Sequence, residues 1–303
     1  MAPDSKSNGP TPAQRWGPDD ERGALNLLGP EVVLAASTAV RTGKVYPLGL
    51  PIQRSGVPII EFRGAPQRLT LINAEEPNPF EPYGAPANVG ANEDMLILAS
   101  HSITHLDALC HVHSDGAIYN GFPAASFTTH AGALRCGIEK VGAIAGRGVL
   151  LDMPAARGVE WLQAGEVLTG ADLQSCADAQ GVEVRSGDIV LVRTGWIDHW
   201  FSLDGAGLPP GQPGIGFDAA RWLKEKDVAV VGSDNSAVEA IPFDQGVYTG
   251  VHLDLLMGAG IYLLEHLRLT ELARDGVHEC LLVVSPLLVT GAAGSPVNPV
   301  AIA

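Results

Sequence analysis

The segment from Ser100 to His113 reads S-H-S-I-T-H-L-D-A-L-C-H-V-H and holds four of the nine histidines of this 303-residue chain. His101, His105, Asp107 and His111 lie at offsets of 0, 4, 6 and 10 residues, which are all even. Side chains alternate between the two faces of an extended strand, so on a strand these four would point to one face. If the chain becomes helical after Asp107, then Asp107 and His111 are still neighbours one turn apart. Either geometry gathers imidazole and carboxylate groups around one point.

Imidazole and carboxylate groups that meet at one point are typical ligands of Zn²⁺ or Mn²⁺. Three protein ligands with an open fourth position indicate a catalytic metal rather than a closed structural one. We therefore predict a metal-dependent enzyme. His101, His105 and Asp107 would bind one divalent metal ion, and His111 would act beside them as a base or acid. The alternative is a cluster of satisfied core histidines or a weak surface metal patch.

The composition excludes several classes of function. The chain is 46% hydrophobic and 17% charged, with a formal net charge of −15. Such an acidic chain is not expected to bind nucleic acid or an anionic membrane. It has no apolar run of about 18 residues that would predict a membrane span. We expect a soluble protein whose partner is a small-molecule substrate.

The ends and the cysteines indicate a cytoplasmic protein. Residues 1–12 lack the apolar core of a secretory signal, so we predict a flexible tail there and one domain over residues 13–303. The four cysteines are widely spread and include no C-x-x-C pair, which is typical of reduced thiols. Cys110 has the opposite strand parity to the histidines, so we assign it to core packing.

Short apolar runs, often rich in valine and isoleucine, predict a mixed, β-rich sheet in one α/β domain. Continuous rather than alternating runs indicate central strands that are covered on both faces. The predicted strands are Val57–Phe62, Met95–Ala99, Gly148–Asp152, Ile189–Arg193, Val228–Ser233 and Cys280–Ser285. The predicted helices are Pro30–Thr42, Thr169–Gln180, Asp218–Lys226 and Val251–Met257, and Ile261–Leu272 is expected to be part strand and part helix.

Two segments rich in proline and glycine, Glu75–Asn88 and Ser202–Gly216, are expected to be long loops. Loops of this length are either active-site lids or passive surface excursions.

Two further segments carry polar groups between apolar residues. In G-S-D-N-S-A-V-E, Asp234, Asn235 and Glu239 could face the metal pocket, although turn and cap chemistry is the favoured interpretation. His252 and Glu265 could complete the metal site or bind a second ion. The chain has no motif for a nucleotide, flavin or haem.

The segment H-S-I-T-H-L-D-A-L-C-H resembles the signature H-x-G-T-H-x-D-x-P-x-H of the metal-dependent cyclase family, which includes bacterial kynurenine formamidase and isatin hydrolase. Ile103 stands in place of the glycine and Leu109 in place of the proline. W-G-P-D-D-E-R-G-A-L-N-L-L, G-D-I-V-L-V-R-T-G-W, G-S-D-N-S-A-V-E and G-S-P-V-N-P-V-A also look like segments of the longer members.

The resemblance implies a swivelling β/β/α fold and a homodimer or homotetramer. It matches His101, His105 and Asp107 to the family's metal ligands and His111 to its catalytic histidine. It places His252 and Glu265 where formamidase-like members bind a second ion.

The leading functional prediction is hydrolysis of an amide, lactam or ester, in which water activated by the metal attacks a carbonyl and His111 relays protons. A cyclic amide or an aryl formamide is the expected substrate type. Four aromatic residues could form a pocket for an aromatic acyl group, namely Trp16, Phe80, Tyr83 and Trp196. The alternatives are a metal-dependent lyase, dehydratase or cyclase of secondary metabolism, and a catalytically silent metal-binding protein.

Overall fold

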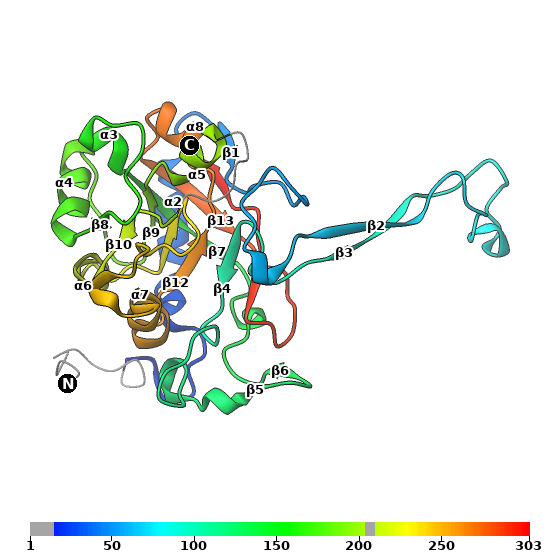
Figure 1. Ribbon diagram of the computed structural model, residues 1–303, viewed down its shortest axis with the longest axis horizontal. Coiled ribbons are helices and arrows are strands. Elements are labelled where there is room, and N and C mark those ends of the chain that lie inside the picture. Colours follow the sequence, from blue (N-terminus) through cyan, green and yellow to red (C-terminus); the bar gives the residue numbers. More distant parts are fainter. Residues whose placement is uncertain (1–14, 204–209) are drawn as a thin grey trace.

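A nine-stranded mixed sheet forms the centre of the computed structural model, which describes residues 15–203 and 210–303 (Figure 1). Its strand order is β1-β15-β13-β7-β9-β11-β12-β4-β14. The bounds of these strands are β1 Val45–Pro47, β4 His105–Asp107, β7 Ile144–Asp152, β9 Ile189–Arg193, β11 Val230–Ser233, β12 Tyr262–Glu265, β13 Glu279–Val284, β14 Gly294–Pro296 and β15 Val300–Ile302.

Three parallel pairings hold the middle of the sheet together. Strand β7 pairs with β9, β9 with β11, and β11 with β12, whereas the strands on either side are antiparallel. Ile189–Leu191 in β9 and Val230–Val231 in β11 are 0% exposed. Side chains from both faces of a strand can be buried only when both faces are covered, so the expectation of doubly covered central strands is confirmed.

Helices cover this central part of the sheet. Helix α4 packs against α6, α3 and β7, and α2 packs against β7. Helix α4 begins with a capping box, in which the Thr169 hydroxyl oxygen accepts from the Asp172 N–H and the Asp172 carboxylate accepts from the Thr169 N–H. The helices are α2 Pro30–Ala36, α3 Met153–Arg157, α4 Gly170–Gln180, α5 Trp196–Ser202, α6 Phe217–Glu225, α7 Gly250–His252 and α8 Thr270–Arg274, and α7 continues as a π-helical turn, η9, over Leu253–Ala259.

The remaining elements are short. Small two-stranded pairs are formed by β8 Val167–Leu168 with β10 Gly214–Ile215 and by β5 Phe127–Thr128 with β6 Gly132–Ala133. Turns of 3₁₀ helix are η1 Gly23–Leu27, η2 Ser37–Ala39, η3 Glu61–Arg63, η4 Glu81–Tyr83, η5 Tyr119–Gly121, η6 Ala124–Ser126, η7 Ile138–Lys140 and η8 Asp244–Gly246.

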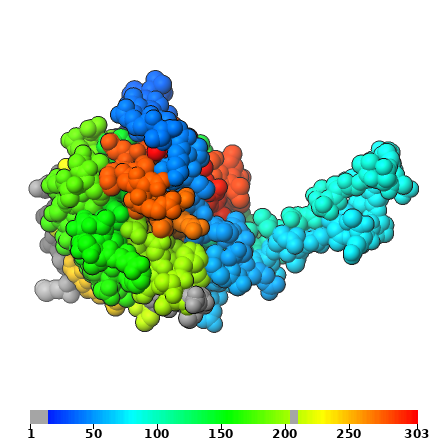
Figure 2. Space-filling model, turned by 90° about the horizontal axis from the view of Figure 1, so that it is seen from above, coloured from blue at the N-terminus to red at the C-terminus, as the bar shows by residue number. Residues whose placement is uncertain are grey.

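A long hairpin, which we call the arm (residues 66–99), projects from the body (Figures 1 and 2). Its strands are β2 Gln67–Ile72 and β3 Glu93–Ile97, which pair antiparallel only with each other. The segment Glu75–Asn88, predicted as a loop that could be a lid, lies at the end of the arm that points away from the body. In a single chain it does not close over the body, because the hairpin extends outward.

The α/β fold with a mixed, β-rich sheet is confirmed, and most predicted elements lie within a few residues of observed ones. The prediction of a strand at Val57–Phe62 is wrong, since that segment ends in the 3₁₀ turn η3. Helix α2 ends earlier than predicted, at Ala36, and 3₁₀ turn η2 follows it. The predicted tail at residues 1–12 and the residues 204–209 of the second predicted loop lie outside the described residues. Within the described residues, no helix has both the length and the apolar character that crossing a membrane requires.

Candidate metal centre

Strands β4 and β12 bring the first three side chains of the candidate site together. The two strands pair antiparallel, with Glu265 opposite His105. The distance from His105 Nε2 to Glu265 Oε2 is 3.1 Å, and that from His105 Nε2 to Asp107 Oδ1 is 3.5 Å. His105 and Asp107 share one face of β4 because they are two residues apart on a strand. All three side chains are at most 3% exposed.

His101 and His111 reach the same point from turns on either side of β4. His101 Nε2 lies 3.3 Å from Asp107 Oδ1, and the rings of His101 and His111 stack with centroids 3.9 Å apart. The predicted extended strand covers only His105–Asp107, because Ile103 adopts a left-handed φ of 56°. The four side chains therefore converge through two turns rather than along one strand.

Gly294 on β14 leaves the space that His101 occupies. A Cβ atom on Gly294 would lie 2.6 Å from His101 Nε2 and 2.9 Å from the Leu106 carbonyl oxygen. Such distances are too short for a real side chain, so the absence of a side chain on this edge strand allows the imidazole to approach Asp107.

His252 closes the inner side of the cluster. Its Nε2 lies 3.3 Å from Glu265 Oε1 and 3.7 Å from Asp107 Oδ2. Its Nδ1–H donates to Glu239 Oε1 at 2.5 Å, and Glu239 also accepts from the backbone N–H of Val251. A carboxylate behind a histidine fixes its tautomer and leaves the other ring nitrogen free for a metal. His105 is held in the same way, since its Nδ1–H donates to the Ile103 carbonyl at 2.8 Å.

The atoms that face the centre of the cluster have no hydrogen-bond partner among the described residues. They are His101 Nε2, His105 Nε2, both carboxylate oxygens of Asp107, and Glu265 Oε1. Buried polar atoms are rarely left unpaired, and a group of them aimed at one point requires an explanation. A divalent cation would pair with all of them at once, so the residues present fit a metal.

The electrostatics of the cluster also call for a cation. Burial disfavours the charged form of His252, but the hydrogen bond to Glu239 and the adjacent Glu265 carboxylate outweigh burial and raise its pKa to about 10. Burial likewise disfavours charge on His105, yet Glu265 and Asp107 raise its pKa above the ordinary value. Burial raises the pKa of Glu265, but the adjacent rings of His105 and His252 hold it well below the usual range. The Glu265 carboxylate thus retains its charge and attracts positive charge into a closed space.

The two outer histidines behave differently. Burial, followed by the neighbouring His111 and His105, lowers the pKa of His101 to about 2. Burial also lowers the pKa of His111, and the nearby Asp107 only partly opposes this. Both rings are therefore neutral at physiological pH, so each offers a lone pair to a metal or to a proton.

Two overlapping groups in the described residues have the spacing of metal ligands, and they share Asp107. One consists of His101, Asp107 and His111, and the other of Asp107, His252 and Glu265. The structure thus gathers all six residues that the sequence singled out, His101, His105, Asp107, His111, His252 and Glu265. It places His111 as close to His101 and Asp107 as a ligand would be.

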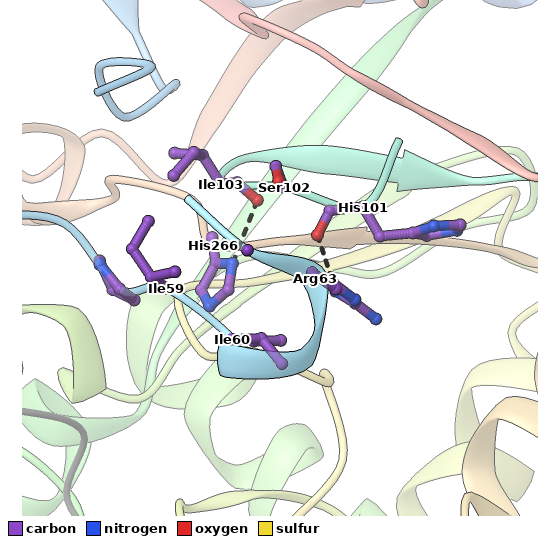
Figure 3. Close-up of a pocket in the computed structure, with 9 residues that line it drawn as sticks. Ile59, Ile60, Arg63, His101, Ser102, Ile103 and His266 are labelled. Carbon is purple, nitrogen blue, oxygen red and sulfur yellow. Dashed lines mark hydrogen bonds between the residues drawn. The ribbon is translucent and has the colours of Figure 1, made fainter. Parts of the chain in front are cut away.

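A small pocket lies at the base of the arm, beside the cluster (Figure 3). Ile59, Ile60 and the ring of His266 line it, and Arg63 Nη1 donates to the His101 carbonyl at 2.7 Å. The imidazole of His101 points away from His266 (Figure 3). His266 donates from Nδ1 to the Ile103 carbonyl at 3.1 Å, and burial, followed by the neighbouring His105, lowers its pKa to about 4.

The four aromatic residues predicted for a substrate pocket are scattered. Phe80 and Tyr83 lie on the distal part of the arm, and Tyr83 is 88% exposed. Trp16 lies under the guanidinium of Arg15, which pairs with Asp227. Asp227 precedes β11, whereas Asp234 follows it, so Trp16 is at the other end of that strand. Only Trp196 is near the site: it is buried and stacks on His266 with centroids 5.8 Å apart. In a single chain the structure does not bring the other three to the cluster.

The sequence named Glu239 only as a residue that could face the metal pocket, and it gave no role to His266. Glu239 stood in a segment interpreted as turn chemistry, and that interpretation holds for Asp234, which accepts from the Thr194 and Gly195 N–H groups. No spacing rule links Glu239 to His252, because the loop that joins them passes through η8. For His266 the one signal in the sequence is that it directly follows Glu265. Cys110 is buried in the core, as predicted.

Comparison with known proteins agrees with this fold. The model of the Cyclase family matches residues 46–240. A crystal structure described as a novel cyclase is 33% identical, covers 97% of this chain and 99% of its own, and has a TM-score of 0.87. An isatin hydrolase bound to the product analogue thioisatinate is 20% identical, with coverages of 92% and 97% and a TM-score of 0.60.

A third structure, isatin hydrolase A from Labrenzia aggregata bound to benzyl benzoate, is also 20% identical, with coverages of 88% and 94% and a TM-score of 0.57. At this identity the two isatin hydrolases show a shared fold. No curated protein matches the chain. The family match spans more than half of the chain, and the novel cyclase is similar over nearly all of it, so this chain belongs to the Cyclase family.

Proposed function

We propose that this protein is a metal-dependent hydrolase of an amide, lactam or ester bond. In this proposal His101, His105 and Asp107 bind one divalent ion, Zn²⁺ or Mn²⁺, and His111 is the catalytic proton carrier. His252 and Glu265 complete the centre or bind a second ion. The observation that carries the proposal is the group of buried, unpaired nitrogen and oxygen atoms that converge between β4 and β12.

A divalent metal bound there would supply Lewis acidity, polarising a carbonyl and lowering the pKa of water towards about 7. The protein's own groups set the direction of approach. The His101 side chain is 12% exposed and His252 7%, whereas His105 is 0% exposed. A substrate carbonyl therefore reaches the centre from the side of His101 and His111.

His111 is suited to carry protons on that open side. Its ring is neutral at physiological pH because burial lowers its pKa, so it accepts a proton from water and can return it to a leaving nitrogen or oxygen. Stacking on His101 holds the ring in place. Such a group contributes roughly 10²–10⁴-fold to a rate.

The similar structures guide the choice of substrate. One of them is an isatin hydrolase bound to a product analogue, so isatin is the first lactam to test, followed by aryl formamides and aryl esters. Hydrolysis in H₂¹⁸O would place the label in a product carboxylate. Turnover without label would identify a lyase or cyclase instead.

The test separates metal binding from proton transfer. Elemental analysis should find about one or two equivalents of Zn or Mn per chain in the wild type and almost none in His105→Ala. His111→Ala should keep its metal and lose about 10²–10⁴-fold in kcat. Loss of metal from His111→Ala would instead make His111 a ligand. A wild type that binds no metal after reconstitution would overturn the proposal.

A further inference from the structure

One arginine, Arg63, lies beside the candidate metal centre without a carboxylate partner. Its Nη1 donates to the His101 carbonyl at 2.7 Å, and this is the only polar contact of its side chain among the described residues. The buried Arg147 and Arg193, in contrast, each pair with two carboxylates. Acidic residues outnumber basic ones 34 to 19 in this chain, so carboxylates are not scarce. The Arg63 guanidinium therefore keeps most of its N–H donors free for a ligand.

Arg63 is held next to the metal centre but outside it. It ends the 3₁₀ turn η3 at the base of the arm, and its hydrogen bond to the main chain of His101 fixes the guanidinium there. It pairs with neither Asp107 nor Glu265, so it does not occupy the space where those side chains converge. Figure 3 shows the guanidinium beside His101 and across the pocket from His266. Burial and the neighbouring histidines lower the pKa of His101, and the charge of Arg63 adds to this effect, so its field reaches that ring.

The pocket between Arg63 and His266 has a donor end and an acceptor end. His266 donates from Nδ1 to the Ile103 carbonyl, so its Nε2 carries a lone pair, and this buried atom has no partner among the described residues. A lone pair repels a carboxylate, whereas a guanidinium presents N–H groups that match both carboxylate oxygens. Ile59 and Ile60 supply apolar walls. These surroundings suit an anion at the Arg63 end, attached to the apolar body of a ligand.

We propose that Arg63 binds a carboxylate that the substrate carries in addition to its scissile carbonyl. The protein then prefers acidic amides, lactams or esters over neutral ones. This inference rests on the proposed function, in which the scissile carbonyl is bound at the metal centre and a substrate arrives from the side of His101 and His111. A divalent ion and a guanidinium beside the same histidine repel each other, and an anion next to Arg63 offsets that repulsion.

The first test compares neutral and acidic aryl formamides. Formanilide is the neutral compound, and 2-, 3- and 4-formamidobenzoate add a carboxylate at increasing distance from the scissile bond. We expect the metal-loaded wild type to favour at least one acid over formanilide by roughly 10–100-fold in kcat/KM, mostly through KM, because a hydrogen bond between charged groups has this strength. Arg63→Gln should remove this preference. Arg63→Lys, which keeps the charge, should retain part of it.

Arg268→Gln is the matched control. Arg268 is exposed, lies three residues after Glu265 and pairs with no carboxylate of the described residues, so this variant removes the same charge close to the site in sequence. It should keep the wild-type preference for the acid. Elemental analysis of each variant checks that the metal content is unchanged. Equal preferences in wild type and Arg63→Gln, or an equal loss in Arg268→Gln, would overturn the proposal.

A binding measurement separates this inference from the proposed function. Calorimetric titration of the metal-loaded protein with benzoate and with benzamide requires no turnover. Benzoate can also bind the ion, so the informative quantity is the ratio of the two affinities, which should fall at least about 10-fold from wild type to Arg63→Gln. That fall without hydrolysis of any substrate would refute the hydrolase and support the anion site at Arg63. Hydrolysis with the same ratio in both proteins would support the hydrolase and refute the anion site.

Discussion

The carbonyl oxygen of Ile103 accepts hydrogen bonds from two histidine rings, those of His105 and His266. Ile103 has a φ of 56°, and a left-handed conformation is costly for a β-branched residue. The family signature has glycine at this position, which reaches that conformation without strain. The conformation turns the carbonyl towards both rings and sets the tautomer of His105. The cost in backbone strain thus serves to orient a metal-facing nitrogen.

Glu239 should control metal affinity without touching the metal. Glu239→Gln weakens the hydrogen bond that orients His252, so we expect metal affinity to fall about 10–100-fold. Competition with a chelator measures this. Glu279→Gln, at a half-exposed carboxylate that pairs with Arg147, is the control and should leave the affinity unchanged. Equal affinities in wild type and Glu239→Gln would show that His252 does not contribute to binding.

The metal-free protein should lose stability as the solution becomes alkaline. The pKa of His252 is raised from 6.5 to about 10 in the folded state, because Glu239 and Glu265 outweigh burial. The stabilisation by its proton is complete below about pH 6.5 and is lost as the pH rises through 10. Urea unfolding of the metal-free chain at pH 7 and pH 9.5 should show a lower free energy of unfolding at pH 9.5. His252→Gln should reduce this difference, and an unchanged slope would contradict the assignment.

At the scale of elements, the ends of adjacent parallel strands are joined by one buried carboxylate. Asp234 follows β11 and accepts hydrogen bonds from the N–H groups of Thr194 and Gly195, which follow β9, at 2.8 and 2.7 Å. This junction lies at the start of α5, which carries Trp196. It therefore fixes the wall behind the pocket at His266.

Removing that junction should cost stability. Asp234→Ala leaves two backbone N–H groups buried and unpaired, so we expect the free energy of unfolding to fall by about 1–3 kcal/mol. Asp178→Ala, at an exposed helix position, should change it by less than about 0.5 kcal/mol. Denaturant midpoints of the two variants give the comparison. A loss no larger in Asp234→Ala than in Asp178→Ala would contradict this role.

The sequence predicted the elements that are buried, because burial on both faces requires a recognisable run of apolar residues. Ile189–Arg193 is a continuous apolar run and is found as β9 with the same bounds. Of the arm, the sequence predicted only the strand Met95–Ala99, which overlaps β3. Strand β2 was not predicted, because it is exposed along almost its whole length and burial leaves no pattern on it. A run such as Val57–Phe62 is equally apolar, but Pro58 lacks a backbone N–H, and the chain turns instead.

For the candidate site, local spacing predicted the residues of 101–111 but not their geometry. Their convergence depends on the left-handed turn at Ile103, on Gly294 and on Glu265 across the β4–β12 pair. Only the turn at Ile103 is local in sequence, and Gly294 and Glu265 reach the site through tertiary structure. Pairing partners such as Glu239 are set by tertiary structure and carry no periodic signal.

For the whole molecule, metal binding should appear as global stability. A ligand that binds only the native state adds about 2.7 kcal/mol when its concentration is 100 times Kd. We expect chelation to lower Tm, and readdition of Zn²⁺ or Mn²⁺ to restore it. In His105→Ala the same treatments should leave Tm unchanged. If chelation removes the metal from the wild type and Tm does not change, the site does not couple the two strands.

The pairing of β4 with β12 also determines when the centre can form. His105 and Glu265 are joined across a long loop of chain, and contacts between such distant residues are slow to close. If this pairing follows the rate-limiting barrier, the ion contributes nothing until the barrier has been crossed. Loading the protein with metal should then lengthen the lifetime of the native state while leaving the refolding rate almost unchanged. The metal would then stabilise the native state after folding and would not take part in the steps that lead to it.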